Sequence, residues 1–441
     1  MNLHIGRSLD VSEIAELLAE ARARTLMLIS RISEDDLRHQ HDSLMSPIIW
    51  DLGHIAHFEE VWLVDRLAAG GGESEGLHGI YNPFETPRAD RGDLPLPTLS
   101  ECLDFMGTVR RSVLGRLRSL DLASGDPLLR DGFAFRLVLQ HEYQHNETIL
   151  QTLQLKSGDP YPAMRAFPVP TGSGDSGSGG GSMVTFPGGE VTIGTDDRSA
   201  AYDNERPEHT MDVAPFRIDV TPVTNGAYKE FVEAGCYRDE GLWDEAGRAW
   251  LNDSQAEAPK YWERVDGVWN TRVMDRSGPV DPTHPVCHVC YHEAAAFARF
   301  AGKRLPTEFE WEAAASWDPA AGAARTYPWG EAPVTHLVAN VDALSFQTTP
   351  VWSYPDNVSP IGCYGMIGDV WEWTASDFEG YPGYQTFPYK EYSEVFFGDQ
   401  YKVLRGGSWA SRSGALRTTF RNWDFPIRRQ IFSGFRCAAD D

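Results

Sequence analysis

The 441-residue chain lacks any apolar run of the ~18–20 residues that are needed to cross a lipid bilayer. Its N-terminus, MNLHIGRSLDVSEIAELL, also lacks a basic segment followed by an apolar one, which is the pattern of a secretory signal. Both absences argue against a membrane protein or an exported protein. We therefore expect a cytoplasmic location.

Cysteine is scarce. Six residues are spread over the whole chain, which excludes a disulfide framework. Cys287 and Cys290 form a C-x-x-C pair with His288 and His292 nearby. A zinc ribbon would need a second such pair at similar spacing, and the sequence has none. We therefore interpret these cysteines as buried free thiols.

Positive charge is also in deficit, because 39 Lys and Arg residues face 64 Asp and Glu residues, for a net charge of −25. Long-range repulsion then disfavours nucleic acid and anionic membranes as partners, although the same charge also fits simple solubility. An apolar content of 41% over this length allows two or three domains, each with its own core.

Residues 1–170 form the first predicted domain. It carries four long segments in which apolar residues recur at three- and four-residue spacing, which predicts amphipathic helices. These segments are 11–32, 46–67, 99–120 and 131–155. Ser46 is a candidate N-cap, with Pro47 at the first helical position. The set suits a four-helix bundle, whose interior commonly holds metal ligands from facing helices.

The stretch TGSGDSGSGGGS, residues 171–182, is typical of a flexible linker and marks a domain boundary. Residues 183–441 are rich in Gly, Pro and Trp, with short strand-like runs and many turn signals. Short helices are predicted at 223–235 and 292–302. This composition indicates an α+β domain with much irregular structure.

The stretch LQHEYQHNET holds His141 and His145, which lie about one helical turn apart on the same face. A further histidine, His54, occupies the predicted inward face of a second helix. His57 competes with it, but His54 lies nearer the face that carries Trp50. Three histidines from two facing helices can form a three-nitrogen site with open positions, which suits iron(II) or zinc.

The same stretch spells H-E-x-x-H, the signature of zinc peptidases, which is an alternative interpretation. A peptidase needs a third metal ligand downstream, commonly Glu or His on a later helix. Glu147 follows His145 by two residues and points to another face, and no later segment resembles a bundle helix that offers a ligand. The peptidase hypothesis is therefore weakly supported.

Several motifs occur in order after the linker. They are TPVTNGAYKEF (221–231), KRLPTEFEWEAAA (303–315), YPWGE (327–331), GDVWEWT (368–374), VLRGGSWA (403–410) and GFRCA (434–438). This region resembles the formylglycine-generating-enzyme-like (sulfatase-modifying-factor) domain, a C-type-lectin-related fold. The preceding bundle resembles a DinB-like domain. Together the two resemble the sulfoxide synthases of ergothioneine biosynthesis (EgtB type) over the whole chain.

The resemblance implies an iron(II) oxidoreductase that joins the thiol sulfur of γ-glutamylcysteine to the imidazole C2 of hercynine, using O2, and leaves a sulfoxide. It assigns the Fe(2+) to His54, His141 and His145. A dicarboxylate substrate needs arginines, because the planar guanidinium binds carboxylate in a bidentate manner. By resemblance, γ-glutamylcysteine is bound by Arg88, Arg91, Asp424 and Arg428. Hercynine, whose quaternary ammonium suits an aromatic face, is bound by Gln144, Asn422 and Trp423.

The resemblance also implies a tyrosine that donates a proton near the iron. The segment 377–397 offers Tyr381, Tyr384, Tyr389 and Tyr392. Tyr389 is preferred from its place in the PYKEYS run, and Tyr384 is the second choice.

One departure excludes formylglycine generation itself. In those oxidases the segment after the G-S-aromatic run carries two copper-binding cysteines, and the corresponding positions here are Ser411 and Leu416. Other donors stay open within the ergothioneine-type architecture, namely free cysteine, as in ovothiol-type enzymes, or a selenosugar, as in selenoneine synthases.

The four residues assigned to γ-glutamylcysteine favour a donor with two carboxylates over a neutral sugar. An ovothiol-type enzyme usually carries an extra methyltransferase domain, which we do not expect here because the chain ends at Asp441. A non-catalytic lectin-like binding module is a further alternative, but such a module would not need three convergent histidines.

Overall fold

The computed structural model describes residues 8–67, 79–156, 158–164, 167–168 and 181–441. The chain forms two compact units. The first holds the described residues up to Pro162 together with Asp197–Ala200, and the second holds Ala163–Asp196 and Ala201–Asp441. The predicted linker, 171–182, lies outside the described residues except for its last two positions.

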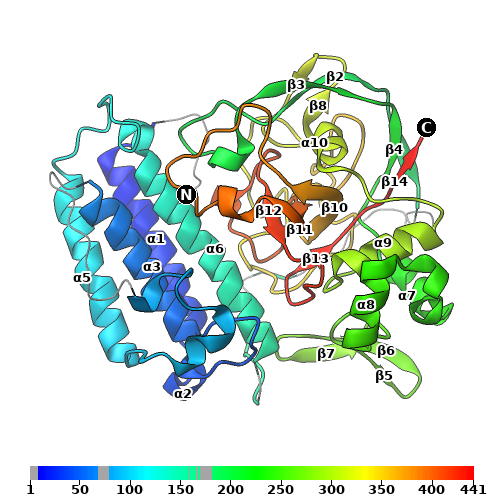
Figure 1. Ribbon diagram of the computed structural model, residues 1–441, viewed down its shortest axis with the longest axis horizontal. Coiled ribbons are helices and arrows are strands. Elements are labelled where there is room, and N and C mark those ends of the chain that lie inside the picture. Colours follow the sequence, from blue (N-terminus) through cyan, green and yellow to red (C-terminus); the bar gives the residue numbers. More distant parts are fainter. Residues whose placement is uncertain (1–7, 68–78, 157, 165–166, 169–180) are drawn as a thin grey trace. The chain divides into compact units, whose positions relative to one another are not determined.

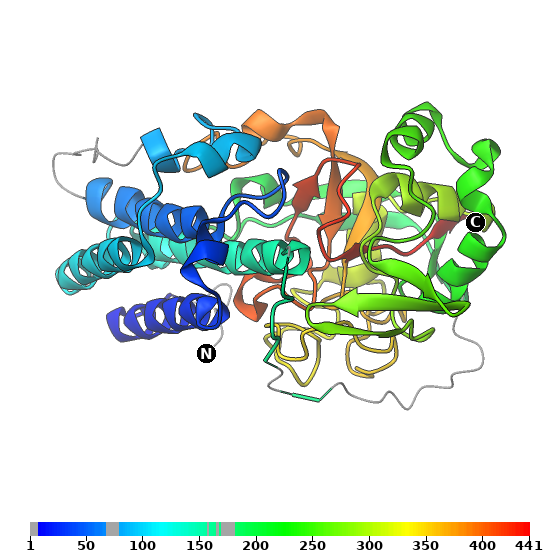
Figure 2. The ribbon, with the colours of Figure 1, turned by 90° about the horizontal axis from the view of Figure 1, so that it is seen from below.

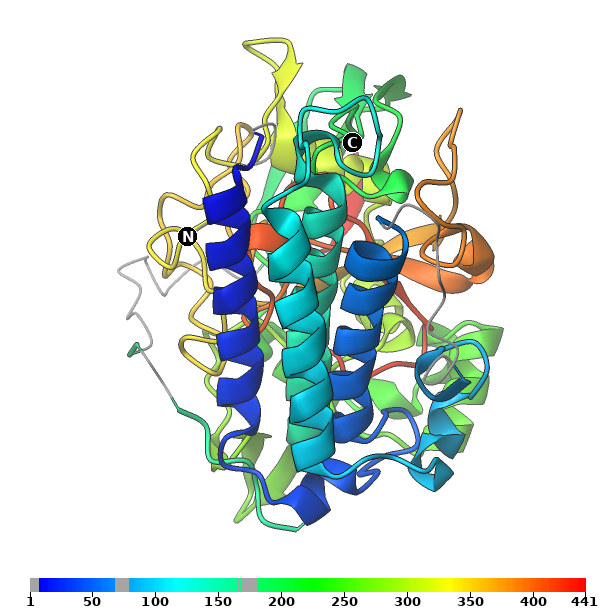
Figure 3. The same ribbon diagram turned by 90° about the vertical axis from the view of Figure 1, so that its left-hand side faces the viewer.

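Four long helices build the first unit. They are α1 (Val11–Ile29), α3 (Ile48–Glu60), α5 (Leu99–Leu117) and α6 (Phe133–Leu155). The helices run alongside one another, with α3 against α5 and α6, and α1 against α6 (Figures 1 and 3). The helical bundle predicted from apolar periodicity is therefore confirmed. The shorter elements are α2 (Glu34–Arg38), η1 (Val61–Asp65), η2 (Arg88–Asp93) and η3 (Arg130–Gly132).

The start of α3 differs from the prediction. The helix begins at Ile48, and Pro47 rather than Ser46 occupies the N-cap position. The Ser46 hydroxyl instead accepts a hydrogen bond of 2.8 Å from Nη1 of Arg91. The prediction of Ser46 as the N-cap is wrong, because its hydroxyl binds a distant guanidinium instead of the first turn of the helix.

A buried network of ion pairs connects the four helices. Arg22 of α1 binds Glu59 of α3 at 2.8 Å and Glu142 of α6 at 3.0 Å. Arg110 of α5 binds Glu59 at 2.6 Å. Removing one partner of a buried ion pair is strongly destabilising, because the other charge is left without compensation. The network therefore favours one arrangement of the helices over others.

The second unit is an α+β domain of several small sheets, as predicted. Its largest sheet has the order β12-β11-β10-β13 and contains β10 (Trp371–Phe378), β11 (Gly398–Arg405), β12 (Asn422–Asp424) and β13 (Ser433–Gly434). A three-stranded sheet has the order β1-β4-β14 and contains β1 (Met183–Phe186), β4 (Phe216–Asp219) and β14 (Ala438–Asp440).

Three smaller sheets complete the β-structure of the described residues. Two are the pairs β2 (Gly189–Ile193) with β3 (His209–Val213), and β8 (Trp317–Asp318) with β9 (Ala323–Ala324). The third is an antiparallel ribbon, shown in light green in Figure 2, of β5 (Trp262–Val265), β6 (Val268–Val273) and β7 (Arg276–Pro279).

The helices of the second unit are short. They are α7 (Asn225–Glu233), α8 (Glu245–Ser254), α9 (Tyr291–Phe300) and α10 (Glu308–Ser316). The first and third of these lie where short helices were predicted. The described part of this unit also has five single turns: η4 (Asp203–Glu205), η5 (Cys236–Arg238), η6 (Glu240–Leu242), η7 (Glu394–Phe396) and η8 (Ser413–Ala415). None of the described helices has the length and apolar character that crossing a membrane requires.

The strand β12 is held in place from both sides. Its residues pair with β11 in antiparallel register, with Trp423 opposite Val403. Arg421, which directly precedes the strand, is fully buried and donates from Nε and Nη2 to the Glu308 carboxylate of α10, each at 2.8 Å. This bidentate ion pair fixes the start of the segment that carries four of the predicted substrate residues.

Candidate metal centre and substrate residues

Three histidines converge inside the first unit. The ligand atoms of His54 on α3 and of His141 and His145 on α6 all lie within 4.8 Å of one another. The Nε2 atoms of His54 and His141 are 3.2 Å apart. Two nitrogens bound to one ion at ~2.1 Å are separated by about 3.0–3.4 Å, so this spacing suits neighbouring ligands of a single metal. The three residues predicted as metal ligands are thus brought together.

Two hydrogen bonds orient two of the three imidazoles. Nδ1 of His54 donates to the backbone carbonyl of Tyr81 at 2.8 Å. Nδ1 of His145 donates to Oδ1 of Asp51 at 3.1 Å. With Nδ1 occupied in this way, Nε2 of each ring is the nitrogen available to a metal. Partners of this kind fix the tautomer and orientation of a ligand histidine and increase its basicity.

Gly53 makes the Tyr81 contact possible. A Cβ added at this glycine would lie 2.1 Å from Cζ of the Tyr81 ring. A residue with a side chain would therefore displace Tyr81, and with it the carbonyl that binds His54. The glycine of the WDLGH run has a packing role next to the metal ligands.

Aromatic rings pack against the ligands. Trp50 stacks on His54 with ring centroids 4.7 Å apart, and Phe58 stacks on His141 at 3.7 Å. Burial lowers the pKa of His54 and of His141 well below the ordinary value for histidine, and the neighbouring His145 lowers both further. Both rings are therefore neutral near pH 7, which is the state that binds a metal.

His57, the competitor for the third position, is not part of the cluster among the described residues. It is buried on the same helix and lies 6.2 Å from the Tyr81 ring, measured between centroids. The geometry therefore favours His54 as the third ligand.

Glu142, the acid of the H-E-x-x-H run, points away from the three histidines into the network of buried ion pairs. Its carboxylate is fully buried and accepts from Nε of Arg22 at 3.0 Å and from Oγ1 of Thr25 at 2.7 Å. Burial alone would raise the pKa of Glu142, but the positive charges of Arg22 and Arg110 lower it overall. In a zinc peptidase this glutamate acts as a general base beside the metal. Here the Glu142 carboxylate instead forms ion pairs with Arg22 and Arg110 inside the bundle.

The predicted substrate residues of the first unit differ in their surroundings. Arg88 is exposed at the start of η2. Arg91 is buried, lies over the Trp50 ring at 3.7 Å, and donates to the carbonyls of Thr86 and Pro83 at 3.1 and 3.0 Å. Arg91 therefore packs behind the indole that stacks on His54. Gln144 is half-buried on α6, one residue before His145.

The remaining substrate residues belong to the second unit. Asn422, Trp423 and Asp424 form β12 and are half-buried. Arg428 follows in the next turn, with its Nε 3.4 Å from Oδ1 of Asp424. Nη1 of Arg428 is buried and has no hydrogen-bond partner among the described residues. A buried guanidinium with an unused donor is suited to an anionic ligand.

Trp423 stacks on Phe378 with ring centroids 4.1 Å apart and an interplanar angle of 7°. The edge of Tyr392 contacts it from another side, with centroids 5.6 Å apart. These contacts fix the plane of the indole, so Trp423 is a rigid aromatic surface. Rigid surfaces of this kind suit a quaternary ammonium group.

The two preferred tyrosines of the four candidates have different environments. The Tyr384 hydroxyl donates to Oδ2 of Asp203 at 2.8 Å. Tyr389 meets Tyr392 edge to face, with ring centroids 6.3 Å apart. Burial raises the pKa of both hydroxyls above the ordinary value for tyrosine, so both are protonated at neutral pH.

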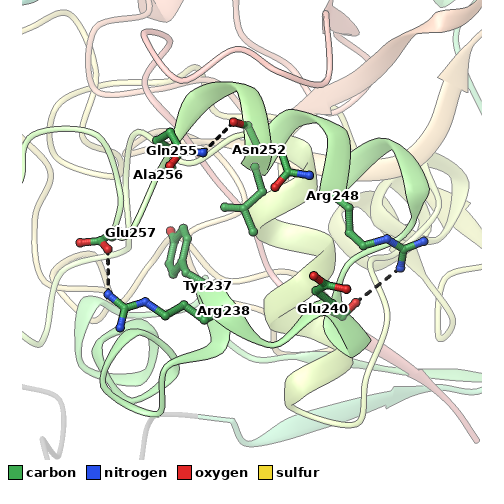
Figure 4. Close-up of a pocket in the computed structure, with 9 residues that line it drawn as sticks. Tyr237, Arg238, Glu240, Arg248, Asn252, Gln255, Ala256 and Glu257 are labelled. Atoms are coloured by element: carbon green, nitrogen blue, oxygen red, sulfur yellow. Dashed lines mark hydrogen bonds and ion pairs between the residues drawn. The ribbon is translucent and has the colours of Figure 1, made fainter.

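The second unit also has a surface hollow of about 240 Å³, lined by side chains of η5, η6 and α8 and the residues after them (Figure 4). An exposed ion pair of 2.8 Å joins Arg238 to Glu257 at its edge. None of the predicted site residues lines this hollow.

Sequence reasoning missed three residues that shape the candidate sites. Asp51 and Tyr81 orient metal ligands, and Asp203 binds Tyr384. Asp51 could have been suspected, because it precedes His54 by three residues and so lies on nearly the same helix face. No sequence pattern points to the Tyr81 carbonyl or to Asp203, because both reach their partners through tertiary contacts.

Comparison with known proteins supports this description. Residues 17–149 match the DinB superfamily, and residues 174–441 match the sulfatase-modifying factor enzyme 1-like domain. A DinB-type bundle with three converging histidines, joined to a sulfatase-modifying-factor-type domain, is the class of protein that the fold and the site define.

Full-length relatives narrow this class. Hercynine oxygenase of Mycolicibacterium thermoresistibile is 44% identical over 441 residues, which covers 97% of this chain and 95% of the relative. Hercynine oxygenase of Mycobacterium tuberculosis is 42% identical and covers 97% and 99%, respectively. Formylglycine-generating enzyme of Streptomyces coelicolor is 35% identical but covers 64% of this chain and 95% of its own length. The chain belongs to the hercynine oxygenase family.

Proposed function

We propose that this protein is an iron(II)- and O2-dependent enzyme that joins γ-glutamylcysteine to hercynine and produces the sulfoxide of the conjugate. The observation that carries the proposal is the convergence of His54, His141 and His145 in a chain that is similar over its whole length to hercynine oxygenases. Small-molecule substrates fit this family, and nothing in the charge of the chain favours nucleic acid.

The reaction balances with O2 as the sole oxidant. The C2–H bond of the imidazole and the S–H bond of the thiol break, and a C–S bond forms. One oxygen atom ends on sulfur as the sulfoxide, and the other leaves as water. The four electrons that O2 accepts come in equal parts from forming the C–S bond and from oxidising the sulfur. A competing reaction places both oxygen atoms on the thiol sulfur and gives a sulfinic acid.

Three converging imidazoles suit iron(II), because a set of three histidine ligands would leave positions for a thiolate, an imidazole and O2. His54, His141 and His145 would hold the iron, with Asp51 and the Tyr81 carbonyl behind them. When bound, iron(II) supplies the redox chemistry that O2 needs to react with a thiol. The aromatic rings of Trp50 and Phe58 limit the access of water to the ligands.

The pair of Asp424 and Arg428 suits the γ-glutamyl end of the thiol donor. That end carries an ammonium group and a carboxylate on one carbon, and the two side chains offer the opposite charges 3.4 Å apart. The buried Nη1 of Arg428 supports this assignment, because a ligand carboxylate would give it a partner. Arg88, which is exposed, and Arg91, which is buried three residues later, would bind the second carboxylate.

Hercynine would be held by Gln144, Asn422 and Trp423. The fixed indole of Trp423 is a suitable surface for the trimethylammonium group. The amides of Gln144 and Asn422 can each donate to a carboxylate and accept from an imidazole N–H. The proton needed at the branch between sulfoxide and sulfinic acid would come from a tyrosine, for which the sequence favours Tyr389 first and Tyr384 second.

The test is anaerobic reconstitution with iron(II), followed by O2, hercynine and γ-glutamylcysteine, with mass spectrometry of the products. We expect the conjugate sulfoxide and one water per O2. Faster turnover with cysteine or a selenosugar would assign the protein to another donor class. Absence of any C–S product from the iron-loaded enzyme would refute the proposed function.

A further inference from the structure

Asp203 binds three groups of one loop. We call residues 381–393 the tyrosine loop, because it holds all four candidate tyrosines. The Asp203 side chain is fully buried, and its Oδ2 accepts from the Tyr384 hydroxyl at 2.8 Å and from the Phe387 backbone N–H at 3.1 Å. Its Oδ1 accepts from the Ser393 hydroxyl at 2.5 Å. One carboxylate therefore holds the loop near its start, at its middle and at its end.

The residues beside Asp203 extend these contacts. Nδ2 of Asn204 donates to the Ser393 hydroxyl at 3.0 Å, and the Tyr202 ring stacks on Tyr392 with centroids 4.1 Å apart. The Asn204 carbonyl accepts from Nη1 of Arg421 at 2.7 Å. Because Arg421 directly precedes β12, the turn η4 connects the tyrosine loop to the strand that carries Asn422, Trp423 and Asp424.

We propose that Asp203 is a positioning residue that fixes the place of the Tyr384 hydroxyl, and that Tyr384 breaks this hydrogen bond when it delivers the proton that directs the reaction to the sulfoxide. This inference rests on the proposed function. It concerns Tyr384 because the Tyr384 hydroxyl is held by a buried acceptor that is itself fixed by two further donors. A group held in one orientation transfers a proton more effectively than one that rotates freely.

The surroundings of Tyr384 agree with this role. Burial raises the pKa of Tyr384, and the negative charge of Asp203 raises it further. The phenol is therefore protonated at neutral pH. The ring is half-buried and packs edge to face on Phe397, with centroids 4.9 Å apart. The ring and the hydroxyl are thus constrained separately.

The experiment measures the ratio of sulfoxide to sulfinic acid in the iron-loaded enzyme. Asp203→Ala removes the acceptor and is expected to shift this ratio towards sulfinic acid by about tenfold. Asp203→Asn is expected to restore most of the ratio, because its carbonyl oxygen can still accept from Tyr384 while its amide donates to Ser393. The double variant Asp203→Ala with Tyr384→Phe is expected to match Tyr384→Phe alone.

A second readout does not depend on activity. Hydrogen exchange of the metal-free protein is expected to be about tenfold faster in the tyrosine loop of Asp203→Ala, because the Phe387 N–H loses its acceptor. Asp369→Ala is the matched control, since the half-buried Asp369 carboxylate also accepts from a side-chain amide, a backbone N–H and a hydroxyl. We expect this control to lower stability without changing exchange in the tyrosine loop or the product ratio.

The outcomes separate the inference from the proposed function. A wild-type enzyme that makes sulfoxide, with an unchanged ratio in Asp203→Ala, would overturn the inference alone. Equal shifts in Asp203→Ala and Asp203→Asn would also overturn it, because charge rather than position would then matter. Additive shifts in the double variant would show that Asp203 does not act through Tyr384. If Asp203→Ala does not fold, Asp203→Ser replaces it, because serine is too short to reach the Tyr384 hydroxyl.

Discussion

Nδ1 of His145 and Oδ1 of Asp51 lie 3.1 Å apart, so a carboxylate on α3 orients a metal ligand on α6. The two helices that supply the metal ligands are thus also joined by a hydrogen bond between their side chains. The Asp51 side chain is buried, and its Oδ2 has no hydrogen-bond partner among the described residues. The bond to His145 therefore accounts for the presence of a carboxylate at this buried position.

We predict that Asp51→Ala weakens iron(II) binding by about 10- to 100-fold, the usual cost of losing a partner behind a ligand histidine. The helical content should stay the same, because the ligands themselves are intact. Competition with a chelator measures the affinity. Asp104→Ala, at an exposed acid of α5, is the control. Equal affinities in both variants would show that Asp51 does not support the metal site.

His54→Ala, His141→Ala and His145→Ala should each lose iron and activity while they keep the fold, because the bundle core does not depend on a single imidazole. Iron content by metal analysis and circular dichroism test both parts. His57→Ala is the matched control on α3 and should keep its iron. Full iron occupancy in His54→Ala would instead move the third ligand to His57.

Glu142→Gln should lower the free energy of unfolding by about 3–5 kcal/mol, because Arg22 and Arg110 lose a buried counter-charge. Iron binding should be unchanged. Urea unfolding and an iron titration test the two expectations. If the variant lost all activity at normal stability and normal iron content, Glu142 would be a catalytic base, as in a zinc peptidase.

Arg88→Ala or Arg428→Ala should raise the KM for γ-glutamylcysteine by roughly 10- to 150-fold, since each removes a charge-assisted hydrogen bond of about 1.5–3 kcal/mol. The KM for hercynine should change far less. Arg238→Ala, at an exposed arginine of the hollow in Figure 4, is the control. Equal losses for both substrates would indicate a folding defect and contradict the assignment.

Tyr384→Phe should keep iron and both substrates but divert product from the sulfoxide to the sulfinic acid, because the reacting centre loses its proton donor. Tyr389→Phe, at the position that the sequence alone favours, should then resemble the wild type. Product analysis by mass spectrometry compares the two variants. If only Tyr389→Phe diverted product to the sulfinic acid, Tyr389 would be the proton donor, as the sequence predicts. A normal ratio of sulfoxide to sulfinic acid in the variants of all four tyrosines would exclude a tyrosine donor.

Much of the bundle and its metal ligands could be predicted from the sequence, because the features involved are local. Apolar spacing of three and four residues determines which face of a helix is buried, and the spacing of His141 and His145 places both imidazoles on that face. The motifs of residues 221–438 resembled one domain family, and that family is confirmed. In each case the prediction depends on residues that are close together in the sequence.

Tertiary structure decided the rest, because the relevant partners are far apart in sequence. The sequence favours His54 over His57 only by its helix face, and the packing of α3 against α6 brings Nε2 of His54 to 3.2 Å from Nε2 of His141. By sequence, Glu142 fits a peptidase motif. In the fold, its negative charge is compensated by Arg22, which lies 120 residues away. Asp203 and Tyr384 are separated by 181 residues, and no local pattern predicts a hydrogen bond over that distance. Local periodicity determines which residues face inward, but the contacts among distant side chains determine which of them bind, which support and which only pack.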